Sequence, residues 1–164
     1  MKERAAATTS PPPKAKASPR DESLDLQRRH QVFGWWALLV FLTLGLVLES
    51  FHGLKLEAYV RVSNETRRLM WTLAHAHGTL LGLVNLAFAA AMRSNIAWKP
   101  GSRNFASSAL LAASVLMPAG FLLGGAFIYG GDPGLGILLV PLGGLLLFAA
   151  VLNTAMAVTT TPPA

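Results

Sequence analysis

Residues 32–51 read VFGWWALLVFLTLGLVLESF, a run that stays apolar until a single acid near its far end. A helix needs about 20 predominantly apolar residues to cross a hydrocarbon core of about 30 Å. The run is too long for the hydrophobic region of a cleavable signal peptide, and it lacks a small-residue cleavage site. Trp35 and Trp36, near its start, are residue types that favour a membrane interface. This stretch therefore predicts a transmembrane helix that remains in the chain as an anchor.

Three further apolar runs of similar length follow the first one. They predict transmembrane helices over about 69–92, 105–129 and 135–158. Strands are excluded by the length of the runs and by their lack of alternation. The predicted fold class is an all-α membrane protein, a four-transmembrane-helix antiparallel bundle over residues 29–158 with a short polar C-terminus at 159–164.

Composition and charge support the same class of protein. Hydrophobic residues make up 52% of the 164 residues and charged residues only 13%, which is more apolar surface than a soluble domain of this size can hide. Residues 1–28 are rich in Ala, Pro, Ser, Thr and Lys, and predict a disordered, basic cytoplasmic tail. The basic residues form no stripe interleaved with aromatics, so nucleic acid is not expected as a partner. The absence of cysteine excludes disulfides and thiolate sites.

The distribution of Lys and Arg predicts an orientation. Seven lie in the first 29 residues and three between 93 and 103, against four between 55 and 68. By the positive-inside rule both termini are cytoplasmic, and the lipid bilayer is the expected partner, with other membrane subunits or a second copy of the chain as further candidates. Arg67 and Arg68 fall on the side that the rule disfavours, so these two residues are candidates for a site.

Ionisable residues inside a membrane span are expensive, and each one marks a candidate site unless it reaches an interface. Glu49 and His52 lie three apart at the end of the first span, hence on one helix face. This Glu-x-x-His spacing is typical of metal sites in helical bundles, and a histidine from the next helix would complete it. Glu49 and His52 are therefore candidate metal ligands. His30, at the opposite interface, is expected to be a flanking residue.

His75 and His77 lie in the second span. Two residues of a helix are about 200° apart, so both rings cannot face one site. The face of His75 continues through small residues such as Gly82, whereas that of His77 continues through bulky ones such as Leu81 and Phe88. His75 is therefore the better candidate for an inward ligand. The small face predicts either close helix packing or room for a planar cofactor.

Haem is one chemistry that these residues would serve. A neutral imidazole binds haem iron, and Arg67 and Arg68 would pair with its propionates, unless they are interfacial anchors. Gly120, Gly124 and Gly125 in the third span fit either close packing or a planar group. Met117 fits either an axial ligand or filler.

The stretch from Arg68 to Gly82, RLMWTLAHAHGTLLG, resembles the His-bearing helix near the start of haem–copper oxidase subunit I and of NnrS-like haem-binding membrane proteins. It is also similar to small bacterial membrane proteins with a His-x-His-x-x-x-Leu-Gly pattern. The resemblance implies a bacterial inner-membrane location, haem b as cofactor, and His75 or His77 as its ligand. It covers one helix of four, and since no His follows His77, it does not extend to oxygen reduction.

Three functions remain open at this point. No nucleophile and base pair, phosphate loop or carboxylate dyad is present, so a non-enzymatic role is favoured. The first hypothesis is a haem-binding or respiratory-chain-associated membrane protein with a site in the outer half of the first two helices. The alternative is a structural or assembly subunit of a membrane complex without a cofactor. The third is a metal-binding protein or an oligomeric small-solute transporter.

Overall fold

The computed structural model describes residues 19–94 and 96–162, and almost all of them are helical. Four of the helices are long and apolar enough to cross a membrane. These long helices are α1 (Pro19–Gly53), α3 (Glu65–Ala91), α4 (Ser102–Ala126) and α5 (Leu139–Thr159). The four predicted apolar spans each correspond to one of them.

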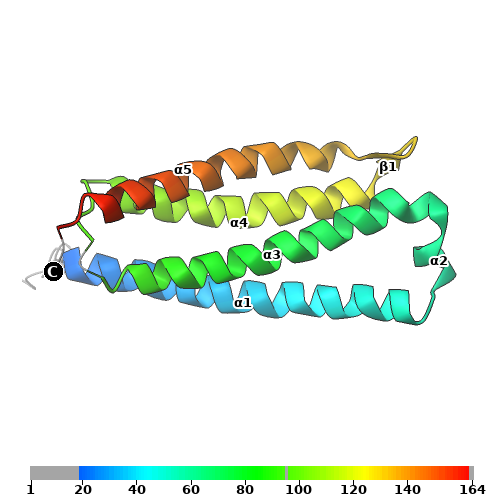
Figure 1. The fold of residues 1–164 in the computed structure, drawn as a ribbon, viewed down its shortest axis with the longest axis horizontal. Coiled ribbons are helices and arrows are strands. Elements are labelled where there is room, and N and C mark those ends of the chain that lie inside the picture. Colours follow the sequence, from blue (N-terminus) through cyan, green and yellow to red (C-terminus); the bar gives the residue numbers. More distant parts are fainter. Residues whose placement is uncertain (1–18, 95, 163–164) are drawn as a thin grey trace, which may run out of the picture.

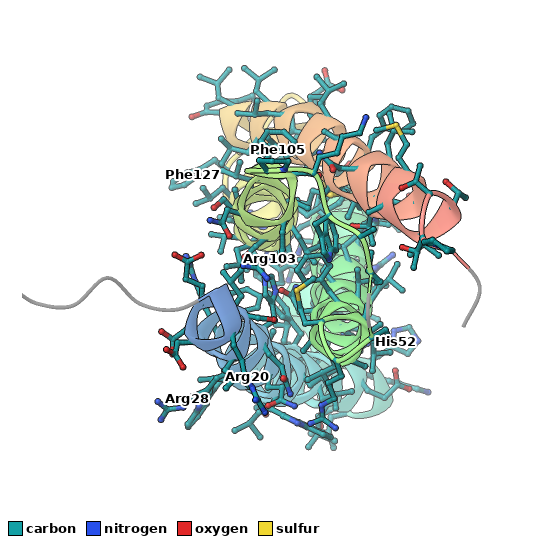
Figure 2. The ribbon with its side chains drawn as sticks, turned by 90° about the vertical axis from the view of Figure 1, so that its left-hand side faces the viewer. Arg20, Arg28, His52, Arg103, Phe105 and Phe127 are labelled. Atoms are coloured by element: carbon teal, nitrogen blue, oxygen red, sulfur yellow. The ribbon has the colours of Figure 1, made fainter. Side chains whose placement is uncertain are left out.

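The long helices form an elongated stack in which consecutive helices run in opposite directions (Figure 1). We call the end where α1 begins and α5 finishes the terminal end, and the opposite one the hairpin end. Contacts join α1 to α3, α3 to α4 and α4 to α5, whereas α1 touches α4 only sparsely. Seen end-on, the four helices form a zigzag (Figure 2). The middle helices α3 and α4 therefore carry the core.

Helix α1 begins at Pro19, earlier than the sequence indicated. Residues 19–28, whose composition predicts part of the disordered tail, are helical. Proline is favoured at the first helical position, and Asp21 and Glu22 in the first turn complement the helix dipole. A carboxylate oxygen of Glu22 also lies 3.7 Å from a guanidinium nitrogen of Arg103 in α4. Residues 1–18 of the predicted tail lie outside the described residues.

Short elements connect the long helices at the hairpin end. They are α2 (Glu57–Val60), the 3-10 helices η1 (Val62–Asn64) and η2 (Leu135–Leu138), and the hairpin of β1 (Ile128–Tyr129) with β2 (Asp132–Pro133). Gly130 and Gly131 have φ of 58° and 96°, which only glycine adopts readily. The third long helix consequently ends at Ala126, three residues before the predicted end of that span.

Helices α1 and α3 pack backbone against backbone. A Cβ placed on Gly34 would lie 2.9 Å from the carbonyl oxygen of Gly82, and one on Gly82 would lie 3.2 Å from that of Gly34. Small residues allow such an approach. By contrast, only 17% of the most apolar window of the first span and 11% of that of the last are buried. α1 and α5 are thus the outer helices of the stack.

Candidate functional site

His75 faces α1, as the small residues on its helix face predict. Its Nδ1 donates a hydrogen bond to the carbonyl oxygen of Phe41 at 2.7 Å. The ring lies directly over Gly45, where a Cβ would overlap it. Because Nδ1 carries the proton in this bond, Nε2 is the ring nitrogen that remains as an acceptor. His75 is therefore held between two helices.

His77 turns to a different neighbour, since two residues along a helix point in nearly opposite directions. Its Nδ1 donates to the carbonyl oxygen of Leu73, one turn earlier, at 2.9 Å. The ring packs on Phe121 of α4, with the ring centroids 4.7 Å apart. His75 thus contacts α1, and His77 contacts α4.

Arg67 and Arg68 bind backbone carbonyls at the hairpin end. Arg67 donates from Nε to the oxygen of Gly125 at 3.0 Å, and its guanidinium lies 5.9 Å from the centre of the Trp71 ring. Arg68 donates to the oxygen of Val60 at 2.7 Å. Both carbonyls belong to the last turn of a helix, where acceptors lack partners. The two arginines therefore hold different elements, the end of α4 and the end of α2.

These residues do not fit a haem in this packing. The space that Gly78 leaves is filled by Phe41, that of Gly125 by Trp71, and that of Gly45 by His75 itself. Met117 is likewise packed against Gly143 of α5. A planar macrocycle beside His75 would require α1 to separate from α3. Of the two interpretations of the glycine faces, the geometry favours close helix packing.

Glu49 and His52 lie on the exposed surface of the last turns of α1. Within residues 19–94 and 96–162, no three or more His, Cys, Asp or Glu side chains come together as a metal site would need. A histidine from α3 does not complete the pair, because His75 and His77 are bound elsewhere.

A buried polar cluster, which the sequence did not predict, lies at the terminal end. It joins His30 of α1, Asn85 of α3, and Ser107 and Ser114 of α4; the first three are 0% exposed and Ser114 is 3% exposed. His30 Nδ1 lies 2.7 Å from Asn85 Oδ1, and His30 Nε2 lies 2.8 Å from Ser107 Oγ. Three helices are therefore connected through one imidazole.

The donors and acceptors of this cluster determine each other. Ser114 donates to the Leu110 carbonyl at 2.7 Å, so its oxygen accepts from Asn85 Nδ2 at 2.8 Å. Asn85 Nδ2 also donates to the Leu81 carbonyl, which leaves Oδ1 as the acceptor for His30. His30 must then carry a proton on Nδ1, and in the neutral imidazole Nε2 accepts the Ser107 hydroxyl proton. A neutral imidazole satisfies every member of the cluster.

The expectation that His30 is a flanking residue is wrong. Because α1 begins at Pro19, His30 lies a full three turns inside the helix and on its packed face, with Phe88 4.6 Å away. A usable signal was present in the sequence, since Ser107 and Ser114 are seven residues apart and hence lie on one face of an apolar helix.

Comparison with protein-family models, with curated proteins and with solved structures finds no match to this chain. The resemblance around His75 thus gains no support from them, and the function must be argued from the geometry.

Proposed function

We propose that this chain is an integral membrane protein that serves as a structural or assembly subunit of a membrane complex. In this proposal its four long helices are antiparallel spans of a bacterial inner membrane, with the terminal end on the cytoplasmic side. The observation that carries the proposal is that three polar side chains within the spans, His30, His75 and Asn85, hydrogen-bond to neighbouring helices. These hydrogen bonds hold the stack of helices together.

The two ends of the stack are held by different kinds of hydrogen bond. At the terminal end, His30, Asn85 and Ser107 connect side chain to side chain. At the hairpin end, His75 binds a carbonyl of α1 and Trp71 binds the Leu122 carbonyl of α4 at 3.3 Å. Inside a bilayer no water can replace these partners, so each bond holds two helices together.

The outer helices supply the surface for lipid or other subunits. On α5, Leu145 is 69% exposed and Phe148 is 67% exposed, and on α1, Leu46 is 68% exposed. Apolar side chains this exposed along two whole helices are typical of contact with a membrane or with membrane partners. The α5 face combines the highest mean hydropathy of the four spans, 2.6, with the lowest burial.

Haem binding is the competing function. His75 supports it in one respect, because a ring held by an Nδ1 to carbonyl bond presents Nε2 as histidine ligands do. Haem binding at His75 requires α1 and α3 to separate. The visible spectrum of the purified chain distinguishes this function from the structural one.

Affinity purification of the tagged full chain from alkali-washed membranes tests the proposal. The chain has no cysteine, so a single Phe148→Cys on α5 can be crosslinked without background, with buried Ala74→Cys as the matched control. We expect a defined membrane partner crosslinked through position 148 only, and no Soret band under ample haem supply. A chain that washes off the membrane, a chain without a crosslinked partner, or a Soret band lost in His75→Ala would overturn the proposal.

A further inference from the structure

The zigzag of helices leaves a continuous groove between α1 and α4. Two hollows of about 410 and 320 Å³ follow one another along this gap and share Phe33 and Val115. On α4 their lining residues recur every three or four positions from 108 to 122, so they occupy one helix face. We call this feature the α1–α4 groove. At 1.5 Å per residue, that face is about 20 Å long, the length of an extended acyl chain.

The groove opens at the terminal end beside two cationic side chains. A third, shallow hollow of about 690 Å³ lies on the surface of α1, where Asp25, Arg28 and Arg29 line it, and adjoins the groove at Phe33 and Trp36. Arg29 lines both the mouth and the first part of the groove. Figure 2 shows Arg28 projecting outward from α1.

The two arginines of the mouth are free to bind a ligand. Within the part of the chain that the structure describes, neither has a hydrogen bond or an ion pair, in contrast to Arg67 and Arg68. Among the described residues that line the mouth, Asp25 is the one acid beside two arginines, which gives these residues a net positive charge. An apolar channel with a cationic mouth is complementary to an anionic amphiphile.

We propose that the α1–α4 groove binds one anionic phospholipid of the bilayer, with an acyl chain along Phe33, Val115 and Ala119 and the phosphate at Arg28 and Arg29. This inference rests on the proposed membrane insertion, because the lipid enters from the leaflet around the terminal end. Juxtamembrane arginines attract the anionic lipids of that leaflet, and Trp36 at the mouth is a residue type that favours the headgroup level.

A second groove provides an internal comparison. On the opposite side of the zigzag, α3 and α5 border a hollow of about 450 Å³ whose lining contains Thr154 and Thr159 but no charged residue. This α3–α5 groove offers an acyl chain the same apolar walls, and a single cation, Lys99, lines an adjoining hollow that shares Thr159 with it. Selectivity for an anionic headgroup is therefore expected to be stronger at the α1–α4 groove, which has two arginines beside it.

Native mass spectrometry of the detergent-purified full chain, titrated with phosphatidylglycerol or phosphatidylcholine of equal chain length, tests the proposal. We expect one phosphatidylglycerol bound with about tenfold preference, equivalent to about 1.4 kcal/mol. R28Q/R29Q should abolish the preference, whereas Lys99→Gln, which removes a charge at the same end outside the groove, should retain it. Ala119→Phe should block binding, and Ala155→Phe in the α3–α5 groove should not.

Three results would overturn the lipid proposal: equal binding of the two lipids by the unmodified chain, a preference that survives R28Q/R29Q, or binding that survives Ala119→Phe in a variant with unchanged thermal stability. Loss of a protein partner through Ala119→Phe with lipid binding unchanged would assign the groove to a protein. None of these results depends on loss of the chain from the membrane. Failure of membrane insertion itself is seen separately, in the alkaline wash.

Discussion

Nδ1 of His30 in α1 lies 2.7 Å from Oδ1 of Asn85 in α3, and both side chains are fully buried. The two residues are 55 positions apart in the chain. Their hydrogen bond ties the outer helix α1 to the middle of the stack at the terminal end, while His75 performs the equivalent function near the hairpin end. The polar residues of α1 and α3 therefore form two interhelical attachments with different chemistry.

Replacing Asn85 with Ala should destabilise the protein by about 1–2 kcal/mol. The change leaves the His30 Nδ1 proton buried without an acceptor, which costs the free energy of desolvating that N–H group. The average free energy of an interhelical hydrogen bond in a membrane is smaller than this loss. Unfolding by a denaturing detergent in micelles measures the loss. Asn104→Ala, at an exposed position of α4 near the same end, is the control and should leave stability unchanged. Equal stability of the two variants would contradict the role of the cluster.

His30 should be found as the Nδ1–H tautomer. Asn85 can offer only an oxygen to His30, because its nitrogen donates to the carbonyl of Leu81 and to Ser114. Nitrogen-15 NMR of selectively labelled histidine distinguishes the two tautomers by the shifts of the ring nitrogens. His30→Gln identifies the signal by its loss. A His30 signal of the Nε2–H type would show that the cluster is arranged differently.

Gly45→Ala should separate α1 from α3 and cost about 1–3 kcal/mol, as overpacking does. The new methyl group overlaps the His75 ring, which must turn and give up its bond to Phe41. Gly144→Ala on α5 is the matched control, because nothing lies within 4 Å of its Cβ position.

The double variant Gly45→Ala/His75→Ala tests the cause of this loss. It should be more stable than expected from the sum of the single changes, because removing the ring removes the clash. Strict additivity of the two losses would contradict the contact.

Arg68→Ala should loosen the connection between α1 and α3. Arg68 binds the carbonyls of Tyr59 and Val60, and its removal takes these two bonds between α3 and the last turn of α2 away. Limited proteolysis of the purified protein should cut between residues 54 and 64 several-fold faster. Arg61→Ala serves as the control, since its ion pair with Glu57 is exposed and contributes little. An unchanged cleavage rate in Arg68→Ala would argue against this function of Arg68.

The existence and approximate extent of the four long helices followed from apolar runs of the required length. The start of α1 could not be found in this way, because residues 19–28 are polar and a hydropathy run stops where polar residues begin. The orientation of His75 toward small residues followed from helical periodicity. Its contact with Gly45 did not, because periodicity places residues on one face without saying which helix covers that face.

The sequence by itself therefore determined how many long apolar helices the chain forms, and which side chains share a face of each, since both depend only on local hydropathy and on the 3.6-residue turn. The tertiary structure alone decided that the helices form an open zigzag, which neighbour each polar residue meets, and that His30 is buried. His30 and Ser107, 77 positions apart, come within hydrogen-bonding distance only when α1, α3 and α4 have packed. No local property of either residue encodes that encounter, because the interhelical hydrogen bonds depend on the lateral arrangement of the whole stack.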